Sequence, residues 1–243
     1  MLTDDLRGVF YIALKDLRAY YFKPPNISWG ILFPFAFVLA FAMRNPANLR
    51  ELVPGLLGLT IMFGTSSMEA IVIVFERRTG ALERLLLAPI RLPALLAGKL
   101  LGGMVFGLTV TGVVLFITAT AFGAQGINWF SLALALFLSA LAFAALGAFV
   151  SVAVKEIFEA QTLANFVRFP MMFLGGVFVP LSSLPVGLQI VARLLPLTYT
   201  VEALRSALAG RPLLNSGLDL LALVVFAVIL FVLAARMLAA RLD

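Results

Sequence analysis

The stretch PALLAGKLLGGMVFGLTVTGVVLFITATAF, residues 93–122, decides the fold class of this chain. It holds 30 residues and a single charged side chain, Lys99. An α-helix rises about 1.5 Å per residue, so about 20 apolar residues cross a hydrocarbon core of about 30 Å. The stretch is therefore long enough to span a bilayer and to extend beyond it.

Five further apolar stretches flank this one. The six predicted spans cover residues 27–43, 52–75, 93–122, 130–154, 163–179 and 218–239. Only 12% of the 243 residues are charged, whereas soluble chains carry about 25%, and the mean hydropathy is +1.09. A surface this apolar needs lipid as its solvent, so we expect an all-α membrane protein with one transmembrane domain over residues 1–243.

Two segments outside the spans are also partly apolar. Residues 1–25 place apolar side chains at helical spacing and charged ones on the opposite side, which predicts an amphipathic helix at the membrane interface. Residues 180–216 are apolar, but prolines interrupt them and no piece reaches spanning length. We expect short re-entrant helices there, between the fifth and sixth spans.

The distribution of lysine and arginine predicts the orientation. With the N-terminus inside, the inner segments hold 12 of these cations and the outer segments hold 5, while Arg168 lies within a span. Cytoplasmic loops carry an excess of such cations. We therefore expect a multi-pass protein of the plasma (inner) membrane with both termini in the cytoplasm.

Several kinds of chemistry are excluded by composition. The chain has no histidine and no cysteine, which removes the commonest general base, thiol nucleophiles and most metal ligands. The net charge of +6 fits cytoplasmic loops better than nucleic-acid binding. A Walker A motif needs Gly-Lys followed by Ser or Thr, whereas Gly98 and Lys99 are followed by Leu100. We expect no enzyme activity and no bound cofactor in this chain.

The loop between the second and third spans, FERRTGALERLLLAPIRLP at residues 75–93, has the most informative pattern. Charged residues alternate with leucines, Gly80 precedes a short helix and Pro89 ends it. A short amphipathic helix at the inner surface can dock into a groove on a soluble partner. The alternative is a solvated loop that only obeys the positive-inside rule.

Here the sequence resembles a family. Residues 78–90, RTGALERLLLAPI, are similar to the inner-loop signature of ABC-2 type transporter permeases. Residues 169–180, FPMMFLGGVFVP, together with LPLTY at 195–199 and EALR at 202–205, are similar to that family's fifth span and its outer re-entrant helices. The order and spacing of these motifs cover almost the whole chain.

The resemblance implies the transmembrane subunit of an ATP-driven exporter. Two copies would pair as a homodimer in the lipid bilayer, or one copy would pair with a close relative, and separate ATPase subunits would bind ATP and Mg²⁺. The resemblance assigns a coupling helix that contacts the ATPase to Arg77, Arg78, Thr79, Gly80, Glu83, Arg84, Leu85 and Leu86. A second inner loop with Lys155, Glu156 and Glu159 is the alternative contact.

Two further groups of residues are candidates for the transport path. In the resembled family the first and fifth spans line the path and the dimer interface. The resemblance therefore implies that role for aromatic residues and methionine of these spans, with lipid-facing filler as the alternative: Phe33, Phe37, Phe169, Met172 and Phe173. Ionisable residues inside a span usually face the bundle interior, so a pair between Glu69 and Arg168 is possible. Gly98–Gly102 and Gly103–Gly107 have the spacing of helix-packing faces.

Two rival functions remain. An ion-coupled secondary transporter would need buried charges at midplane, for which only Glu69 and Arg168 are candidates. A non-transporting membrane assembly factor is the other alternative. Co-purification with an ATPase separates both from the exporter.

Overall fold

The computed structural model of the chain describes residues 2–23, 26, 32, 35, 36, 39, 40, 49–88 and 90–241. Helices account for the regular secondary structure of these residues, and no strand occurs among them. The predicted first span, 27–43, lies mostly outside this part of the chain, and so do Phe33 and Phe37.

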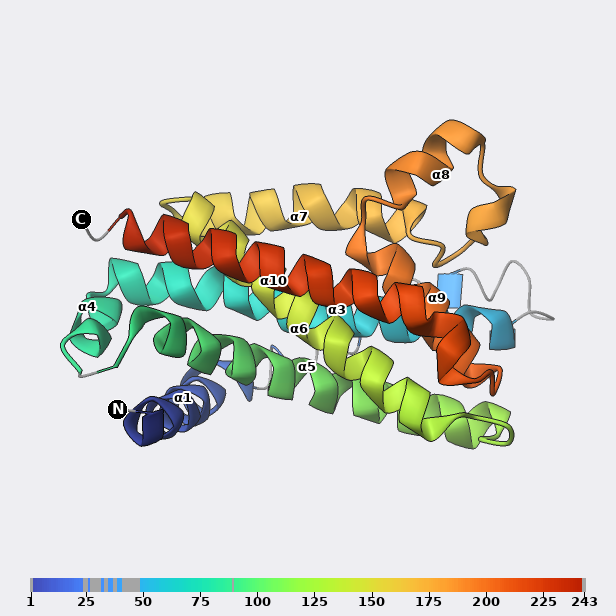
Figure 1. Cartoon of the computed structure of the whole chain (residues 1–243), viewed down its shortest axis with the longest axis horizontal. Coiled ribbons are helices and arrows are strands. Elements are labelled where there is room, and N and C mark those ends of the chain that lie inside the picture. Colours follow the sequence, from blue (N-terminus) through green and yellow to red (C-terminus); the bar gives the residue numbers. More distant parts are fainter. Residues whose placement is uncertain are drawn as a thin grey trace.

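Five long helices lie side by side along the long axis of the molecule (Figure 1). They are α3 (Leu49–Arg78), α5 (Leu92–Phe122), α6 (Trp129–Ala153), α7 (Ile157–Leu174) and α10 (Gly217–Ala239). All except α7 are long and apolar enough to cross a membrane. The all-helical membrane class is thus confirmed with four candidate spans in the described residues, and the count of six spans stays a prediction.

Helix α7 differs most from the sequence-based boundaries, which were 163–179. It begins earlier because Glu156 and Glu159 form a capping box at its N-terminus. It ends earlier because the Gly175–Gly176 pair follows, and Gly176 has a φ of 75°. Glu159 and Arg168 also make α7 less apolar than its neighbours. It is therefore not among the four helices that qualify as candidate spans.

The helices differ in how deeply they are buried. In the most apolar window of α3, 78% of the residues are buried, against 22% in α10. The exposed side of α10 carries only aliphatic side chains among its large hydrophobic residues: Leu218, Leu221, Val224, Val225, Val228, Ile229, Val232 and Leu233. Helix α3 therefore forms the centre of the bundle, and α10 turns an apolar side outward, as contact with lipid requires.

The glycines of α5 set its close approach to two neighbours. A Cβ on Gly107 would lie 2.2 Å from Thr65 Cγ2 of α3, and a Cβ on Gly98 would lie 3.0 Å from Ile12 Cβ of the N-terminal helix. Both distances are below ordinary van der Waals contact. The two G-x-x-x-G patterns thus serve helix packing, as predicted, but each packs against a different partner.

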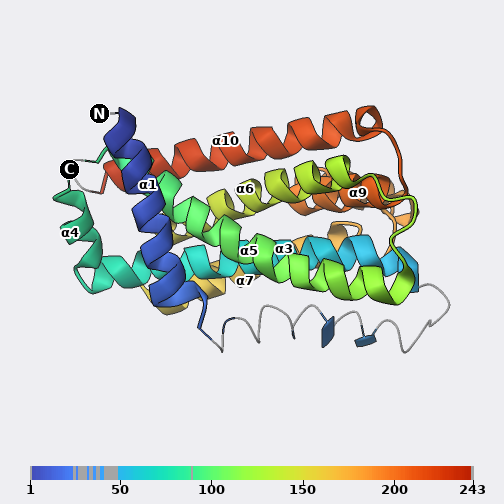
Figure 2. The same cartoon turned by 90° about the horizontal axis from the view of Figure 1, so that it is seen from below.

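Short helices occupy both ends of the bundle. Helix α1 (Leu2–Asp16) and the π-helical turn Leu17–Tyr21 cross the long helices beside α4 (Ala81–Leu86) (Figure 2). At the opposite end lie α8 (Val186–Ala192) and α9 (Pro196–Leu208). We call these the α4 end and the α9 end. Short helices thus occur where residues 180–216 were expected to form them, and their depth in the membrane remains a prediction.

Candidate functional site

Helix α4 lies in the connection between α3 and α5, at the end of the bundle that also holds the last described residues (Figure 2). Gly80, with a φ of 70°, supplies the left-handed backbone that turns the chain after α3. Leu82 is 2% exposed, and Leu85 and Leu86 pack against the same core cluster. Leu87 is 86% exposed. Three leucines therefore attach α4 to the bundle, and a fourth faces away from it.

Leu85 and Leu86, which the sequence assigned to the contact with a partner, are partly buried against the core cluster of the bundle. Their contact with a partner stays a prediction. A six-residue helix has only one apolar stripe, and the bundle uses it. The open side consists of Glu83 and Arg84, both exposed, together with Leu87.

The second inner loop is joined to the end of α3. Arg78 forms an ion pair with Glu156, and Arg77 donates a hydrogen bond to the carbonyl oxygen of Val154. The Glu159 carboxylate accepts hydrogen bonds from the backbone N–H of Lys155 at 3.0 Å and of Glu156 at 3.2 Å. Glu156 and Glu159 thus have structural partners within the chain, while the side chain of Lys155 is exposed.

The C-terminal end of α10 supports the same loop. Arg241 donates to the carbonyl oxygens of Ala153 at 3.1 Å and Val154 at 3.0 Å. These carbonyls lie at the C-terminal end of α6, where backbone carbonyl groups have no hydrogen-bond donor within the helix. The ends of α3, α6 and α10 and the start of α7 are therefore connected at one place.

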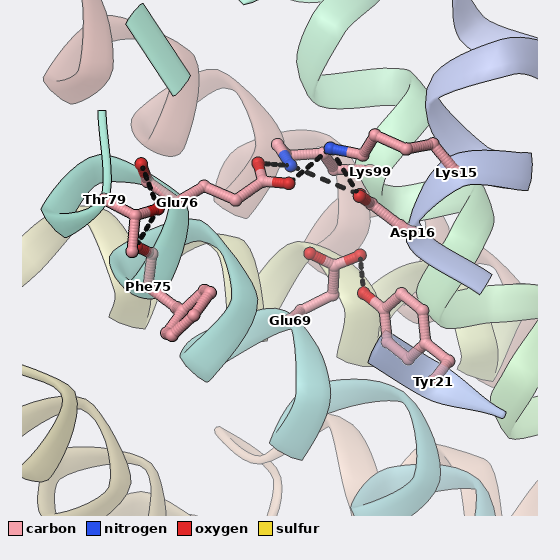
Figure 3. Close-up of polar contacts among 8 residues, drawn as sticks. All are labelled: Lys15, Asp16, Tyr21, Glu69, Phe75, Glu76, Thr79 and Lys99. Atoms are coloured by element: carbon pink, nitrogen blue, oxygen red, sulfur yellow. Dashed lines mark hydrogen bonds and ion pairs between the residues drawn. The ribbon is translucent and has the colours of Figure 1, made fainter. Parts of the chain in front are cut away.

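A cluster of four charged side chains lies where α1, α3 and α5 meet (Figure 3). Lys99 Nζ lies 3.2 Å from Asp16 Oδ2 and also pairs with Glu76. Lys15 Nζ lies 2.9 Å from Asp16 Oδ1 and pairs with Glu76 as well. Two lysines and two carboxylates thus alternate in a closed ring, which we call the charge cluster.

The charge cluster is almost completely buried. The side chains of Asp16 and Glu76 are 0% exposed and that of Lys99 is 1% exposed, whereas Lys15 keeps 38% of its surface open. Removing charges from water costs several kcal/mol per ion, and pairing with opposite charges offsets that cost. The ring meets this requirement because its formal charges sum to zero.

The two members on α1 show how the ring affects protonation. Burial raises the pKa of the Asp16 carboxyl; Lys99 acts in the opposite direction, and the neighbouring Glu76 carboxylate raises the pKa further. Burial lowers the pKa of the Lys15 ammonium, but hydrogen bonds to Glu76 and Asp16 outweigh it, so the net pKa is raised. Lys15 therefore stays charged throughout the physiological pH range.

Glu69 and Arg168 do not form the pair that the sequence suggested. Glu69 is buried and accepts a hydrogen bond of 2.9 Å from the hydroxyl group of Tyr21. Arg168 is also buried; it donates to the Ala164 carbonyl oxygen at 3.0 Å and to the hydroxyl of Ser67. Positions 67 and 69 are two residues apart on α3, so they point to nearly opposite sides of the helix. The two charges therefore face different neighbours.

The candidate path residues of α7 divide into two groups. Met172 is 0% exposed and belongs to the core, so it is not on an open surface. Phe169 is 40% exposed and Phe173 is 57% exposed. Phe166, one helical turn before Phe169, is 75% exposed. The α7 side chains that could contact a second copy or a cargo are therefore the phenylalanines, without the methionine.

The charge cluster was not predicted from the sequence. Lys99 is the only charged residue in the apolar stretch 93–122, which was a usable signal, because a lysine in a span needs a partner. Its partners gave no comparable signal. Asp16 and Glu76 lie among other charged residues, and no spacing rule connects position 16 with position 99.

A bundle of apolar helices that turns aliphatic side chains outward, with charges at its ends or held by ion pairs and hydrogen bonds inside it, defines an integral membrane protein. The family model of the ABC-2 type transporter matches residues 8–209, so the chain belongs to the ABC-2 type transporter family.

Some curated relatives carry the name of a transport permease, and others that of a nodulation protein. The inner membrane transport permease YadH of Escherichia coli (strain K12) is 29% identical over 168 residues, which are 69% of this chain and 66% of YadH. Nodulation protein J of Rhizobium leguminosarum bv. trifolii is 30% identical over 191 residues, 74% of this chain and 72% of that protein. Nodulation protein J of Rhizobium meliloti (strain 1021) is 36% identical over 118 residues, 47% and 45% of the two chains. The chain thus spans just under two thirds of the length of YadH.

Proposed function

We propose that this chain is the membrane-spanning permease subunit of an ATP-driven exporter and that a separate ATPase subunit docks on α4. The observation that carries the proposal is the open side of α4, where Leu87 is 86% exposed between the charged residues Glu83 and Arg84 and the start of α5. An exposed apolar side chain with charged neighbours can form the centre of a small contact whose rim charges set the register.

Two further observations support the need for a partner. Gly98 and Lys99 lack the hydroxyl residue of a Walker A motif, so we propose that ATP and Mg²⁺ bind to the ATPase subunit. Relatives such as YadH carry the name of transport permease. We further propose an inner-membrane location, with the α4 end and both termini in the cytoplasm, where ATP is available.

We propose a homodimer as the assembled form of the permease. Phe166, Phe169 and Phe173 lie on an exposed side of α7, a helix that is less apolar than the other long helices. Burial against a second copy would suit this mixed surface better than lipid alone. The bound cargo would then pass between or beside the two copies.

The decisive experiment is affinity purification of the chain from membranes of its native host, followed by identification of co-purifying proteins. We expect a protein with a Walker A motif, ATPase activity in the complex, and a particle mass that fits two permease copies. If the purified chain is active in transport without any ATPase, an ion-coupled mechanism replaces this proposal. A particle with one permease copy would refute the dimer.

A variant of Leu87 tests the docking site itself. Leu87→Asp should reduce co-purification of the ATPase strongly, because a carboxylate in a desolvated contact costs several kcal/mol. Glu83→Arg and Arg84→Glu should reduce co-purification of the ATPase less, since charges at the rim of a contact set how the partners align more than how tightly they bind. Leu214→Asp is the matched control, because Leu214 is 90% exposed at the α9 end. Equal loss of ATPase from the Leu87 and Leu214 variants would contradict docking on α4.

A further inference from the structure

Helix α1 is attached to the α4 end at several points along its length. A Cβ on Gly98 of α5 would lie 3.0 Å from Ile12 Cβ, so the two helices touch closely there. Near the N-terminus of α1, Asp5 accepts a hydrogen bond of 3.4 Å from the backbone N–H of Arg91. After α1, Tyr21 donates its hydrogen bond to Glu69 of α3. The N-terminal segment is thus connected to α3, to α5 and to the chain between α4 and α5.

The charge cluster lies where α4 is attached to the bundle. Glu76 belongs to the last turn of α3, and Thr79, which follows α3, donates to the carbonyl oxygen of Glu76 at 3.3 Å. Lys99 lies about two turns into α5, the helix that begins after α4. Figure 3 shows both side chains meeting Asp16 and Lys15 of α1. Any displacement of α4 therefore acts on two helices that are ion-paired to α1.

We propose that the charge cluster makes α1 part of the moving unit, so that α1, α3, α4 and α5 are displaced as one body when the ATPase subunit pushes on α4. The inference rests on the proposed function, because it assigns a mechanical role to the neighbourhood of the same docking site. Lys15, Asp16, Glu76 and Lys99 are positioning residues in this scheme, since they contact neither the nucleotide nor the partner.

The physical reason is the cost of separating buried charges. If α1 slid along α5, the contacts of Lys99 with Asp16 and of Lys15 with Glu76 would break, and each of the four charges would keep one partner instead of two. Losing two ion-pair contacts among side chains that, apart from Lys15, are almost fully buried is unfavourable in a low-dielectric interior, so the ring has one favoured register. An apolar contact alone would resist sliding much less, because apolar side chains find similar contacts after a small shift.

Movement of α1 would also displace apolar side chains at the membrane surface. The side of α1 that faces away from α5 exposes Leu6, Phe10 and Tyr11. These side chains suit the interfacial region of the lipid bilayer. If α1 moves with α4, this apolar face is displaced within the lipid headgroup layer in each transport cycle.

A disulfide that retains all four charges tests whether α1 and α5 move together. The chain has no native cysteine, so Ile12→Cys with Gly98→Cys is a clean pair; its Cβ atoms, 3.0 Å apart, must separate by about 0.5 Å to reach the usual disulfide spacing. In the complex with its co-purified ATPase, the ATPase rates of the oxidised and reduced forms should agree within about twofold. The two single-cysteine variants, treated with the same oxidant, are the controls.

Two results of this experiment would overturn the proposal. A loss of ATPase rate of about tenfold on oxidation, recovered by reduction, would mean that α1 must slide along α5. Failure to form both this disulfide and the one between residues 16 and 102, whose Cβ atoms lie 3.6 Å apart, would mean that the two helices do not stay in contact in the complex.

A second cysteine pair tests the charge cluster directly. Asp16→Cys with Gly102→Cys removes one carboxylate, and the Cβ of residue 102 would lie 3.6 Å from Asp16 Cβ, which suits a disulfide. In the reduced form we expect the ATPase subunit to remain bound but its rate to change severalfold from that of the unmodified complex. Oxidation should restore the rate, because a covalent link replaces the ion pair. A normal rate in the reduced form, or no recovery on oxidation, would contradict a positioning role.

A charge-balanced variant keeps the test valid if loss of Asp16 alone prevents folding. Asp16→Asn with Lys99→Met leaves Lys15 and Glu76 as a neutral pair, so no uncompensated charge is buried. We expect this variant to assemble with the ATPase and to show the same severalfold change in rate, and a normal rate would refute the inference. If the unmodified chain itself brings down no ATPase, the proposed function fails instead, and the two failures are distinguishable.

Discussion

Single glycine positions decide how closely α5 approaches its neighbours. The hydroxyl group of Thr65 on α3 donates to the carbonyl oxygen of Ile61 at 2.7 Å, which holds its side chain in place. Its methyl group therefore occupies the space that a side chain at Gly107 would need. One turn or so further along α5, nothing lies within 4 Å of a Cβ on Gly112. The same residue type thus has a packing role at one position and none at the other.

Gly107 and Gly112 allow a matched prediction. Gly107→Ala should lower the stability of the permease by about 1–3 kcal/mol, because the added methyl group overpacks the contact with Thr65. Gly112→Ala should be neutral or stabilise slightly, because alanine favours the helix by up to about 1 kcal/mol. Thermal unfolding midpoints of the purified variants in one detergent give the comparison. Equal midpoints would show that α3 and α5 do not meet at Gly107.

Side chains of Glu156 and Glu159 hold the N-terminus of α7 and the loop before it. The Glu159 carboxylate satisfies the backbone N–H groups of Lys155 and Glu156, which have no partner within the helix. Arg78 attaches the same loop to α3 through Glu156. The acidic residues of this loop therefore stabilise the start of α7, and a docking role is not needed to explain them.

This assignment predicts separate effects on α7 and on the partner. Glu159→Ala should loosen the first turn of α7, at a cost of about 1 kcal/mol, because the capping box loses one of its two side chains. Amide hydrogen exchange in residues 157–160 should become faster. The ATPase subunit should co-purify as before, with Leu87→Asp as the positive control for its loss. Loss of the ATPase from the Glu159 variant would instead identify the second loop as the main contact.

The whole molecule has two ends of different character. Helices α1 and α4 and the last described residues gather at one end, and α8 and α9 lie at the other (Figure 1). The segments at the α4 end are those that hold most lysines and arginines of the chain. The excess of lysine and arginine that the positive-inside rule describes therefore lies at one end of the folded bundle.

Labelling of single cysteines tests this orientation without a background, because the chain has no native cysteine. In intact cells a membrane-impermeant maleimide should react with Gln125→Cys and Leu188→Cys. It should reach Arg78→Cys and Lys155→Cys only after the cells are opened. The opposite pattern would reverse the orientation and would place α4 away from cytoplasmic ATP.

The sequence by itself determined the class of the protein, the positions of most long helices and the resemblance to the ABC-2 family. These features depend on apolar length, on Gly and Pro breaks and on local motifs, which are properties of contiguous residues. The break at Gly80 and the short helix after it were predictable for the same reason. The early end of α7 was missed because a run such as 169–179 is apolar whether or not its glycines stop the helix.

Only the tertiary structure decided the partners of the charges and the open side of α4. Lys99 and Asp16 are 83 positions apart, and Glu69 meets Tyr21 across 48 positions. Their contact depends on how each helix is rotated about its axis and where helices cross, and side-chain packing sets both quantities. Hydropathy along a chain identifies which segments enter the membrane, but it contains no term for that rotation. Leu85 and Leu87 have the same side chain, yet the fold packs Leu85 partly against the core and leaves Leu87 exposed.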